Sequence, residues 1–233
     1  HRVRWWGAFP AYLEVLAQRR ENVKFLPGIR IPRTLQIIPD LSVAVKSAEL
    51  VIVATPSQYL RGIARQLRGL TSAGTSLLTV AKGLEQRTLK RMSQVMTEEL
   101  GPIPLAVLSG PNIAAEIAKG LPASSVVAST SQPLALKIQH IMMSDRLRLY
   151  TSRDVIGVEL GGALKNPIAI AAGIGDGLKL GTNAKAALLT RGVVEMARLG
   201  VALGAKERTF WGLSGLGDLV TTCLSGRNRW LGE

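Results

Sequence analysis

The sequence is poor in cysteine and in aromatic residues. It has one cysteine, Cys223, among 233 residues, together with three Phe, four Trp and three Tyr. A single thiol excludes an internal disulfide and a metal site built from several cysteines, and we predict no metal. The aromatic residues do not interleave with the basic ones, as they would in a platform on which single-stranded bases stack.

Long apolar runs free of charge or repeated glycine are also lacking. No such run reaches the length that crosses a membrane, and the basic start of the chain lacks the apolar region and cleavage site of a signal peptide. We therefore predict a cytoplasmic protein without membrane insertion. Low-complexity linkers and internal repeats are absent as well, which favours a continuous globular chain.

What the sequence does contain is apolar residues and positive charge. Hydrophobic residues make up 47% of the chain, which is enough for one large core or two modest ones. The 29 Lys and Arg residues outnumber the 16 Asp and Glu residues, giving a net charge of +13 that favours anionic partners. Because the basic residues are scattered, a phosphorylated small molecule fits at least as well as nucleic acid. A non-enzymatic nucleic-acid-binding module remains an alternative that only the charge suggests.

Short apolar runs alternate with helical patterns through the first two thirds of the chain. The predicted strands are Val3–Trp6, Leu35–Ile38, Glu49–Thr55, Ser76–Lys82, Leu105–Gly110 and Ser124–Ser129. The predicted helices between them are Ala11–Arg20, Leu41–Ser47, Tyr59–Leu70, Leu89–Leu100, Ile113–Lys119 and Leu134–Met143. This alternation indicates an α/β domain of the Rossmann type, with a mostly parallel sheet covered on both faces.

The pattern changes after Leu147–Asp154. From Val155 onward only helices are predicted, including a glycine-rich one and a second over Ala184–Leu203. We therefore expect a dinucleotide-binding domain over residues 1–152 and an all-α substrate-binding domain over residues 153–233.

Three strand ends carry polar residues suited to binding, namely Ala54–Ser57, Ala81–Glu85 and Ser109–Glu116. Ligands of open α/β sheets bind beyond the carboxyl ends of the strands. Gly110 turns the chain into a helix whose first N–H groups could meet an anion, with Lys82 beside them. The plainer alternative is an ordinary turn beside a solvated lysine.

The helical part carries a second polar set. Lys165 lies within a run of small and aliphatic residues, where the loss of hydration implies either a partner or a chemical role. Asp218 either orients a lysine or caps a helix, and Arg227 either grips a phosphate or is one of many exposed cations.

Several stretches together carry a family resemblance. They are VIVATPS, AKGLE, SGPNIAAE, VELGGALKNPIAIAAGIGDGL, NAKAALLTRGVVEMARLG and GLGDLVTTC followed by GRNR. In order and spacing they resemble the NAD(P)-dependent glycerol-3-phosphate dehydrogenases over essentially the whole chain. The most specific signal is GALKN followed, 53 residues after its lysine, by the aspartate of GLGDL.

The resemblance implies a reaction and a set of site residues. The reaction is the interconversion of dihydroxyacetone phosphate and sn-glycerol 3-phosphate with NAD or NADP, which supplies glycerophospholipid synthesis, and a homodimer is compatible with it. Lys165 is the implied catalytic acid/base, and Lys82, Ala114 and Arg227 are the implied cofactor contacts. The implied substrate contacts are Lys82, Gly110, Asn112, Asn166, Asp218, Thr222, Gly226, Arg227 and Asn228. A related two-domain NAD(P)-dependent hydroxy-acid dehydrogenase is the nearest alternative.

The chain also departs from the family pattern. The family opens with a strand and a G-x-G-x-x-G turn for the pyrophosphate, and neither occurs here. We therefore expect a fragment of a longer protein, lacking the first strand of its sheet and the last helices, that binds dinucleotide negligibly by itself. No Asp or Glu follows Val3–Trp6, and Ala8 stands where the family often has arginine, so the sequence does not distinguish NAD from NADP.

Overall fold

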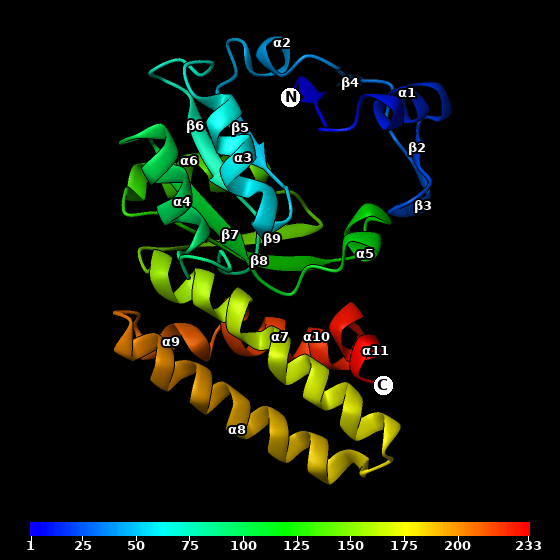
Figure 1. The fold of residues 1–233 in the computed structure, drawn as a ribbon, viewed down its shortest axis with the longest axis vertical. Coiled ribbons are helices and arrows are strands. Elements are labelled where there is room, and N and C mark those ends of the chain that lie inside the picture. Colours follow the sequence, from blue (N-terminus) through cyan, green and yellow to red (C-terminus); the bar gives the residue numbers. More distant parts are fainter.

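The computed structural model describes residues 1–233 and has a sheet layer stacked on a helical layer (Figure 1). The strands are β1 (Val3–Trp5), β2 (Glu21–Asn22), β3 (Leu26–Arg30), β4 (Leu35–Ile37), β5 (Leu50–Val53), β6 (Ser76–Thr79), β7 (Leu105–Ser109), β8 (Ala123–Ala128) and β9 (Leu147–Ser152). The helices that accompany them are α1 (Pro10–Arg19), α2 (Leu41–Val45), α3 (Ser57–Leu67), α4 (Met92–Leu100), α5 (Ala114–Ala118) and α6 (Gln132–Met142). The helical layer comprises α7 (Val155–Gly177), α8 (Gly181–Ala202), α9 (Glu207–Phe210), the π-helical turn η1 (Leu213–Gly217), α10 (Asp218–Ser225) and α11 (Arg227–Gly232).

The main sheet has five strands in the order β5-β6-β7-β8-β9. Strands β5, β6 and β7 are parallel to one another, β8 runs antiparallel to β7, and β9 is parallel to β8. The carboxyl ends of β5, β6 and β7 therefore meet at one edge of the sheet, where polar side chains follow them.

Helices cover both faces of this sheet because its strands are apolar on both sides. In β6, Leu77 packs in a cluster with Leu60 of α3 and Met96 of α4, whereas the next residue, Leu78, packs with Ile138 of α6. Neighbouring residues of a strand point to opposite faces, so Leu77 packs against α3 and α4 on one face of the sheet and Leu78 packs against α6 on the other.

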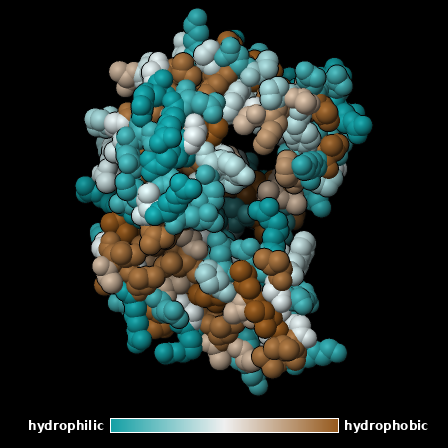
Figure 2. Space-filling model, in the orientation of Figure 1, coloured by the Kyte–Doolittle hydropathy of each residue, from teal (hydrophilic) through white to brown (hydrophobic).

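A separate lobe precedes the main sheet along the chain. It contains a parallel pair of β1 with β4 and an antiparallel pair of β2 with β3, and its small core is formed by Leu13, Leu16 and Ile31. Figure 2 shows a hollow between this lobe and the rest of the molecule. Strand β5, at the edge of the main sheet, does not pair with the lobe.

The helical layer is built around α7. Its core includes Leu160 of α7, Met196 of α8, Phe210 of α9 and Leu219 of α10. Helix α7 has 23 residues and contains an 18-residue stretch with a mean hydropathy of 1.3, enough in length and composition to cross a membrane, yet half of that stretch is buried inside the protein. These contacts are those of the central helix of a globular layer. Figure 2 shows hydrophobic residues gathered on the surface of the helical layer.

Most predicted elements are confirmed within a few residues, and two shifted helix starts have a local cause. Helix α6 begins at Gln132 because Ser131 accepts a hydrogen bond from the N–H of Leu134, and Pro133 is tolerated in the first turn. Helix α4 begins only at Met92, because Leu89 has a φ of 55°, which is left-handed and not helical.

Candidate active site

Helix α7 carries Lys165 into the junction between the two layers. A Cβ at Gly161 would lie 2.3 Å from the carbonyl oxygen of Ser214, so glycine is needed for η1 to approach α7 this closely. One turn further along, Lys165 points to the same region and is only 7% exposed. The glycine-rich sequence of α7 thus permits the packing that buries the lysine.

The buried ammonium of Lys165 has two partners on α10. Its Nζ donates to Oδ1 of Asp218 at 2.5 Å and to Oγ1 of Thr222 at 2.6 Å. Asp218 and Thr222 are four residues apart, so they share one face of α10. The Thr222 hydroxyl in turn donates to the backbone carbonyl of Asp218 at 2.7 Å. This bond orients the hydroxyl so that its oxygen accepts the hydrogen bond from Nζ of Lys165.

A second lysine reaches the same carboxylate from the sheet. Lys82 follows β6, and its Nζ donates to Oδ2 of Asp218 at 2.6 Å and to the carbonyl of Gly110 at 2.8 Å. A Cβ at Gly110 would lie 2.9 Å from Cα of Ser125, so this turn requires glycine for its close approach to β8. Asp218, itself 2% exposed, therefore bridges two cations, one from each layer.

This environment lowers the pKa of Lys165. Burial is the largest cause, since it penalises the charged amine, and the positive charge of Lys82 lowers the pKa further. Asp218 acts in the opposite direction by stabilising the ammonium. Lys165 can therefore lose its proton at a lower pH than an exposed lysine, as a group that exchanges protons with a substrate must.

Asn166 and Asn228 form a second polar pair next to this network. Nδ2 of Asn228 donates to Oδ1 of Asn166 at 2.8 Å, joining α11 to α7. The turn before α11 is tight, because a Cβ at Gly226 would lie 2.5 Å from the carbonyl oxygen of Thr222. Arg227, between Gly226 and Asn228, is exposed and makes no side-chain hydrogen bond or ion pair within the protein.

The remaining predicted residues lie at the end of β7. Asn112 is held by Ser125, donating to its hydroxyl at 2.6 Å and accepting from it at 2.9 Å. Ala114 is exposed at the first position of α5. The structure thus joins Lys165, Lys82 and Asp218 in one network with Thr222 and Gly110, and leaves Ala114 and Arg227 outside it.

Sequence reasoning placed Ser109 at the start of a candidate binding segment but gave it no role, and in the structure it lies next to Lys82 of this network. Its hydroxyl is buried without a hydrogen-bond partner, and a Cβ at Gly162 would lie 2.7 Å from it and 3.4 Å from Cδ of Lys82. The GG pair shortly before Lys165 was the available signal, because adjacent glycines in a helix indicate close packing.

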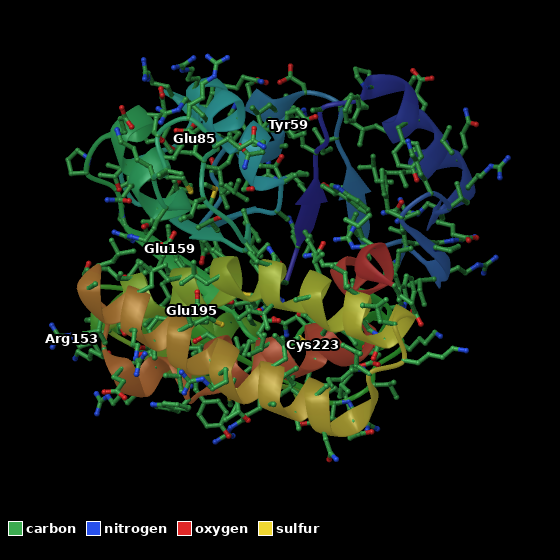
Figure 3. All side chains as sticks on the ribbon, turned by 60° about the horizontal axis from the view of Figure 1, so that its bottom comes forward. Tyr59, Glu85, Arg153, Glu159, Glu195 and Cys223 are labelled. Carbon is green, nitrogen blue, oxygen red and sulfur yellow. The ribbon has the colours of Figure 1, made fainter.

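Glu159 was also missed. Its carboxylate accepts hydrogen bonds from Arg91 at 2.5 Å and from the backbone N–H and hydroxyl of Ser93 at 2.7 and 2.6 Å. Figure 3 shows Glu159 at the junction of the two layers. These bonds fix the first half of α7 to the start of α4, which holds Lys165 in register with the sheet.

Two other kinds of chemistry have little basis in the structure. No three His, Cys, Asp or Glu side chains converge in a group suited to a metal ion. Cys223 lies inside the helical layer, and burial raises its pKa to about 11, which keeps the thiol protonated near neutral pH. The distinctive feature of the site is the buried Lys165, whose pKa is lowered.

Comparison with known proteins gives the family. Residues 1–135 match the family described as NAD-dependent glycerol-3-phosphate dehydrogenase N-terminus, and residues 154–233 match the one described as NAD-dependent glycerol-3-phosphate dehydrogenase C-terminus. The chain belongs to the NAD-dependent glycerol-3-phosphate dehydrogenase family. The family, the enzyme class and the fold class predicted from the sequence are confirmed.

Individual relatives match along nearly the whole chain. Glycerol-3-phosphate dehydrogenase [NAD(P)+] of Moorella thermoacetica is 50% identical over 98% of this chain and 68% of its own length. Glycerol-3-phosphate dehydrogenase [NAD(P)+] 2 of Salinibacter ruber is 46% identical over the same shares. The crystal structure of glycerol-3-phosphate dehydrogenase from Coxiella burnetii superimposes with a TM-score of 0.95 at 38% identity, covering 99% of this chain and 71% of that one.

Proposed function

We propose that this chain interconverts dihydroxyacetone phosphate and sn-glycerol 3-phosphate by hydride transfer with NAD or NADP. One observation carries the proposal, namely the buried Lys165 whose ammonium is held by Asp218 and Thr222 and whose pKa is lowered by burial. Family membership adds independent support, since the relatives named above are glycerol-3-phosphate dehydrogenases.

Lys165 is the acid/base of this proposal. In the oxidation, its neutral amine accepts the proton of the C2 hydroxyl of glycerol 3-phosphate while a hydride leaves C2. In the reduction, its ammonium gives a proton to the carbonyl oxygen of dihydroxyacetone phosphate as C2 receives the hydride. Asp218 stabilises the ammonium formed on oxidation, and Thr222 orients it. Oxidation should therefore speed up, and reduction slow down, as pH rises through the pKa of Lys165.

The other predicted residues have proposed roles in binding. Lys82 is 24% exposed at its side chain, so part of it remains accessible while Asp218 and Gly110 hold its amine. The exposed guanidinium of Arg227 offers a planar fork of donors that suits a phosphate. The residues assigned to the substrate are Lys82, Gly110, Asn112, Asn166, Asp218, Thr222, Gly226, Arg227 and Asn228.

Three residues would hold the dinucleotide. Lys82 and Arg227 bring positive charge, and Ala114 brings an exposed small side chain beyond the end of β7, so the donors and the available space fit an anionic cofactor. The nicotinamide, when bound, accepts or supplies the hydride. The protein contributes the position of C2 and the proton at Nζ of Lys165.

Substitution of the lysine tests the assignment. Made in a chain extended to the length of the relatives named above, Lys165→Met should lower turnover by roughly 10²–10⁴-fold, the usual contribution of a positioned acid/base, while cofactor binding stays near normal. Lys137→Met is a matched control, because Lys137 is exposed on α6 and takes no part in this network. Steady-state rates and calorimetric titration of NADH and NADPH would be measured on both variants. Near-wild-type turnover of Lys165→Met would overturn the role.

Two other functions are separable by simple assays. A related hydroxy-acid dehydrogenase would turn over phosphate-free hydroxy acids, which should be inert if Arg227 and Asn228 bind phosphate. A nucleic-acid-binding module would not need Lys165, and its affinity would fall steeply with salt. Activity restricted to phosphorylated substrates favours the proposal over both.

The wider setting is also proposed. We infer a two-domain division at residue 152, supply of glycerol 3-phosphate to glycerophospholipid synthesis, a cytoplasmic location without membrane insertion, and no metal requirement. A homodimer is compatible with these properties, and sedimentation of the purified protein would measure it. The change from strands to helices between β9 and α7 supports the division.

A further inference from the structure

A cavity lies beside the first turn of α7, away from Asn166 in the middle of that helix. Its volume is about 470 Å³, and its walls come from the end of β9, the first turns of α7 and the segment from α9 to η1. This volume suits a small metabolite. None of the residues that line it belongs to the network of Lys165, Lys82 and Asp218. We call it the β9 cavity.

The rim of the β9 cavity is basic. Arg153, Lys206 and Arg208 line it, all three are exposed, and none takes part in an ion pair within the protein. Figure 3 shows Arg153 at the outer edge of the molecule, away from Cys223 in the helical layer. Three unpaired cations around one cavity are an electrostatic site for an anion.

The one acidic residue of the cavity is already engaged. Oδ1 of Asp154 accepts the N–H of Gly157 at 3.0 Å, and Oδ2 accepts the N–H of Lys206 at 2.9 Å and the hydroxyl of Thr209 at 2.6 Å. Asp154 is buried and serves as the N-cap of α7. Its hydrogen-bonding capacity is used by the fold, and the cavity keeps a net positive charge.

A serine hydroxyl is also available at the cavity. Ser214 lines the cavity and is 1% exposed as a residue, and its hydroxyl takes part in no hydrogen bond within the protein. This hydroxyl is not among the fully buried polar atoms, so it can donate to a ligand that enters the cavity.

We propose that the β9 cavity binds a phosphate monoester outside the catalytic centre. The guanidinium groups of Arg153 and Arg208 would contact the phosphate oxygens in pairs, with Lys206 as a third cation and Ser214 as a neutral donor. This site goes beyond the proposed function, whose own phosphate contacts are Arg227 and Asn228. The cavity adjoins the first turn of α7. Lys165 lies on the same helix, about 15 Å further along its axis at the rise of an α-helix.

Trp211 offers a built-in reporter for the test. It lies in sequence between the lining residues Thr209 and Gly212 and is half-exposed. Protein labelled with 5-fluorotryptophan would be titrated with glycerol 2-phosphate at constant ionic strength, and the ¹⁹F resonance of Trp211 followed, assigned with Trp211→Phe. We expect a saturable shift of this resonance.

Variants then locate the binding. Arg153→Gln combined with Arg208→Gln should weaken the binding by about tenfold or more, because two charge-assisted contacts are lost. Ser214→Ala should weaken it by a smaller factor. Arg2→Gln combined with Arg19→Gln removes the same charge from exposed positions of the N-terminal lobe and should leave the affinity unchanged.

Three results would overturn the proposal. They are a shift that does not saturate, an equal shift on titration with sodium chloride, and equal weakening by the control pair in the N-terminal lobe. Arg227→Gln separates this inference from the proposed function: it should leave the Trp211 titration unchanged even where phosphate binding at the catalytic centre is lost.

Discussion

Replacing the carboxylate that bridges the two lysines is the sharpest perturbation of the site. In the variant Asp218→Asn the side chain keeps its size but loses its charge. Lys82 is partly exposed and can recover hydration, whereas the Lys165 side chain is 9% exposed and cannot. The variant therefore places two cations side by side with one of them buried.

The structure sets the expected magnitude. Removing one partner of a buried ion pair costs about 3–5 kcal/mol, because the remaining charge is left in a poorly solvated position. For a chain of this size each kcal/mol lowers the melting temperature by roughly 2–4 °C, so we expect a fall of about 6–20 °C. Adding Lys165→Met removes the buried cation, and the double variant should be more stable than Asp218→Asn alone.

The loss of stability in Asp218→Asn should also depend on pH. Because the pKa of Lys165 lies below its ordinary value of 10.5, the unfolded chain binds more protons than the folded one between those two values, and stability rises with pH there. Losing Asp218 lowers the pKa of Lys165 further and extends this window to lower pH. Asp218→Asn should therefore cost more stability at about pH 6 than at about pH 9.

Urea denaturation at both pH values would measure the free energy of unfolding of the wild type, Asp218→Asn and the double variant. The reasoning is refuted if Asp218→Asn is at least as stable as the double variant, or if its loss of stability is the same at both pH values. Either result would mean that the carboxylate of Asp218 does not stabilise the ammonium form of Lys165.

Two further predictions concern packing and acid stability. Gly161→Ala should destabilise the protein by about 1–3 kcal/mol, because its Cβ would meet the Ser214 carbonyl. Gly175→Ala has room for its Cβ and should stabilise the protein by up to about 1 kcal/mol. Thermal unfolding of both variants would measure this, and a Gly161→Ala protein more stable than Gly175→Ala would contradict it. Hydrogen bonds from Arg61 lower the pKa of Glu85 to about 2, so stability is lost as pH falls from about 4.5 toward 2. Glu85→Gln should flatten that loss in acid denaturation curves, and an unchanged curve would refute it.

Local patterns predicted most of the fold. Apolar runs bounded by turn residues marked six strands correctly, and the clearest of them, β6, is buried along its whole length. The hairpin of β2 and β3 was missed, since Glu21–Asn22 is short and polar and Leu26–Arg30 contains proline and glycine. Strand β9 was not recognised because its alternating Leu147–Ser152 pattern fits an edge strand with a solvated face.

The site was predictable as a set of residues but not as a set of contacts. The resemblance named Lys165, Lys82 and Asp218, yet only the folded chain shows one carboxylate bonding both lysines. Ser109 was placed in a candidate segment without a role and Glu159 was not singled out, because the contacts of both come from elements far away in sequence. Pairing between distant segments is what a local pattern cannot specify.

The bridge from Lys82 to Asp218 also sets an order of events during synthesis. The two residues are 136 positions apart. At a translation rate of about 5–20 residues per second, Asp218 is added roughly 7–27 s after Lys82. During that interval the sheet can form while Lys82 carries an uncompensated charge at its edge. The proposed capacity to transfer a proton would therefore arise only after α10 has docked against the sheet.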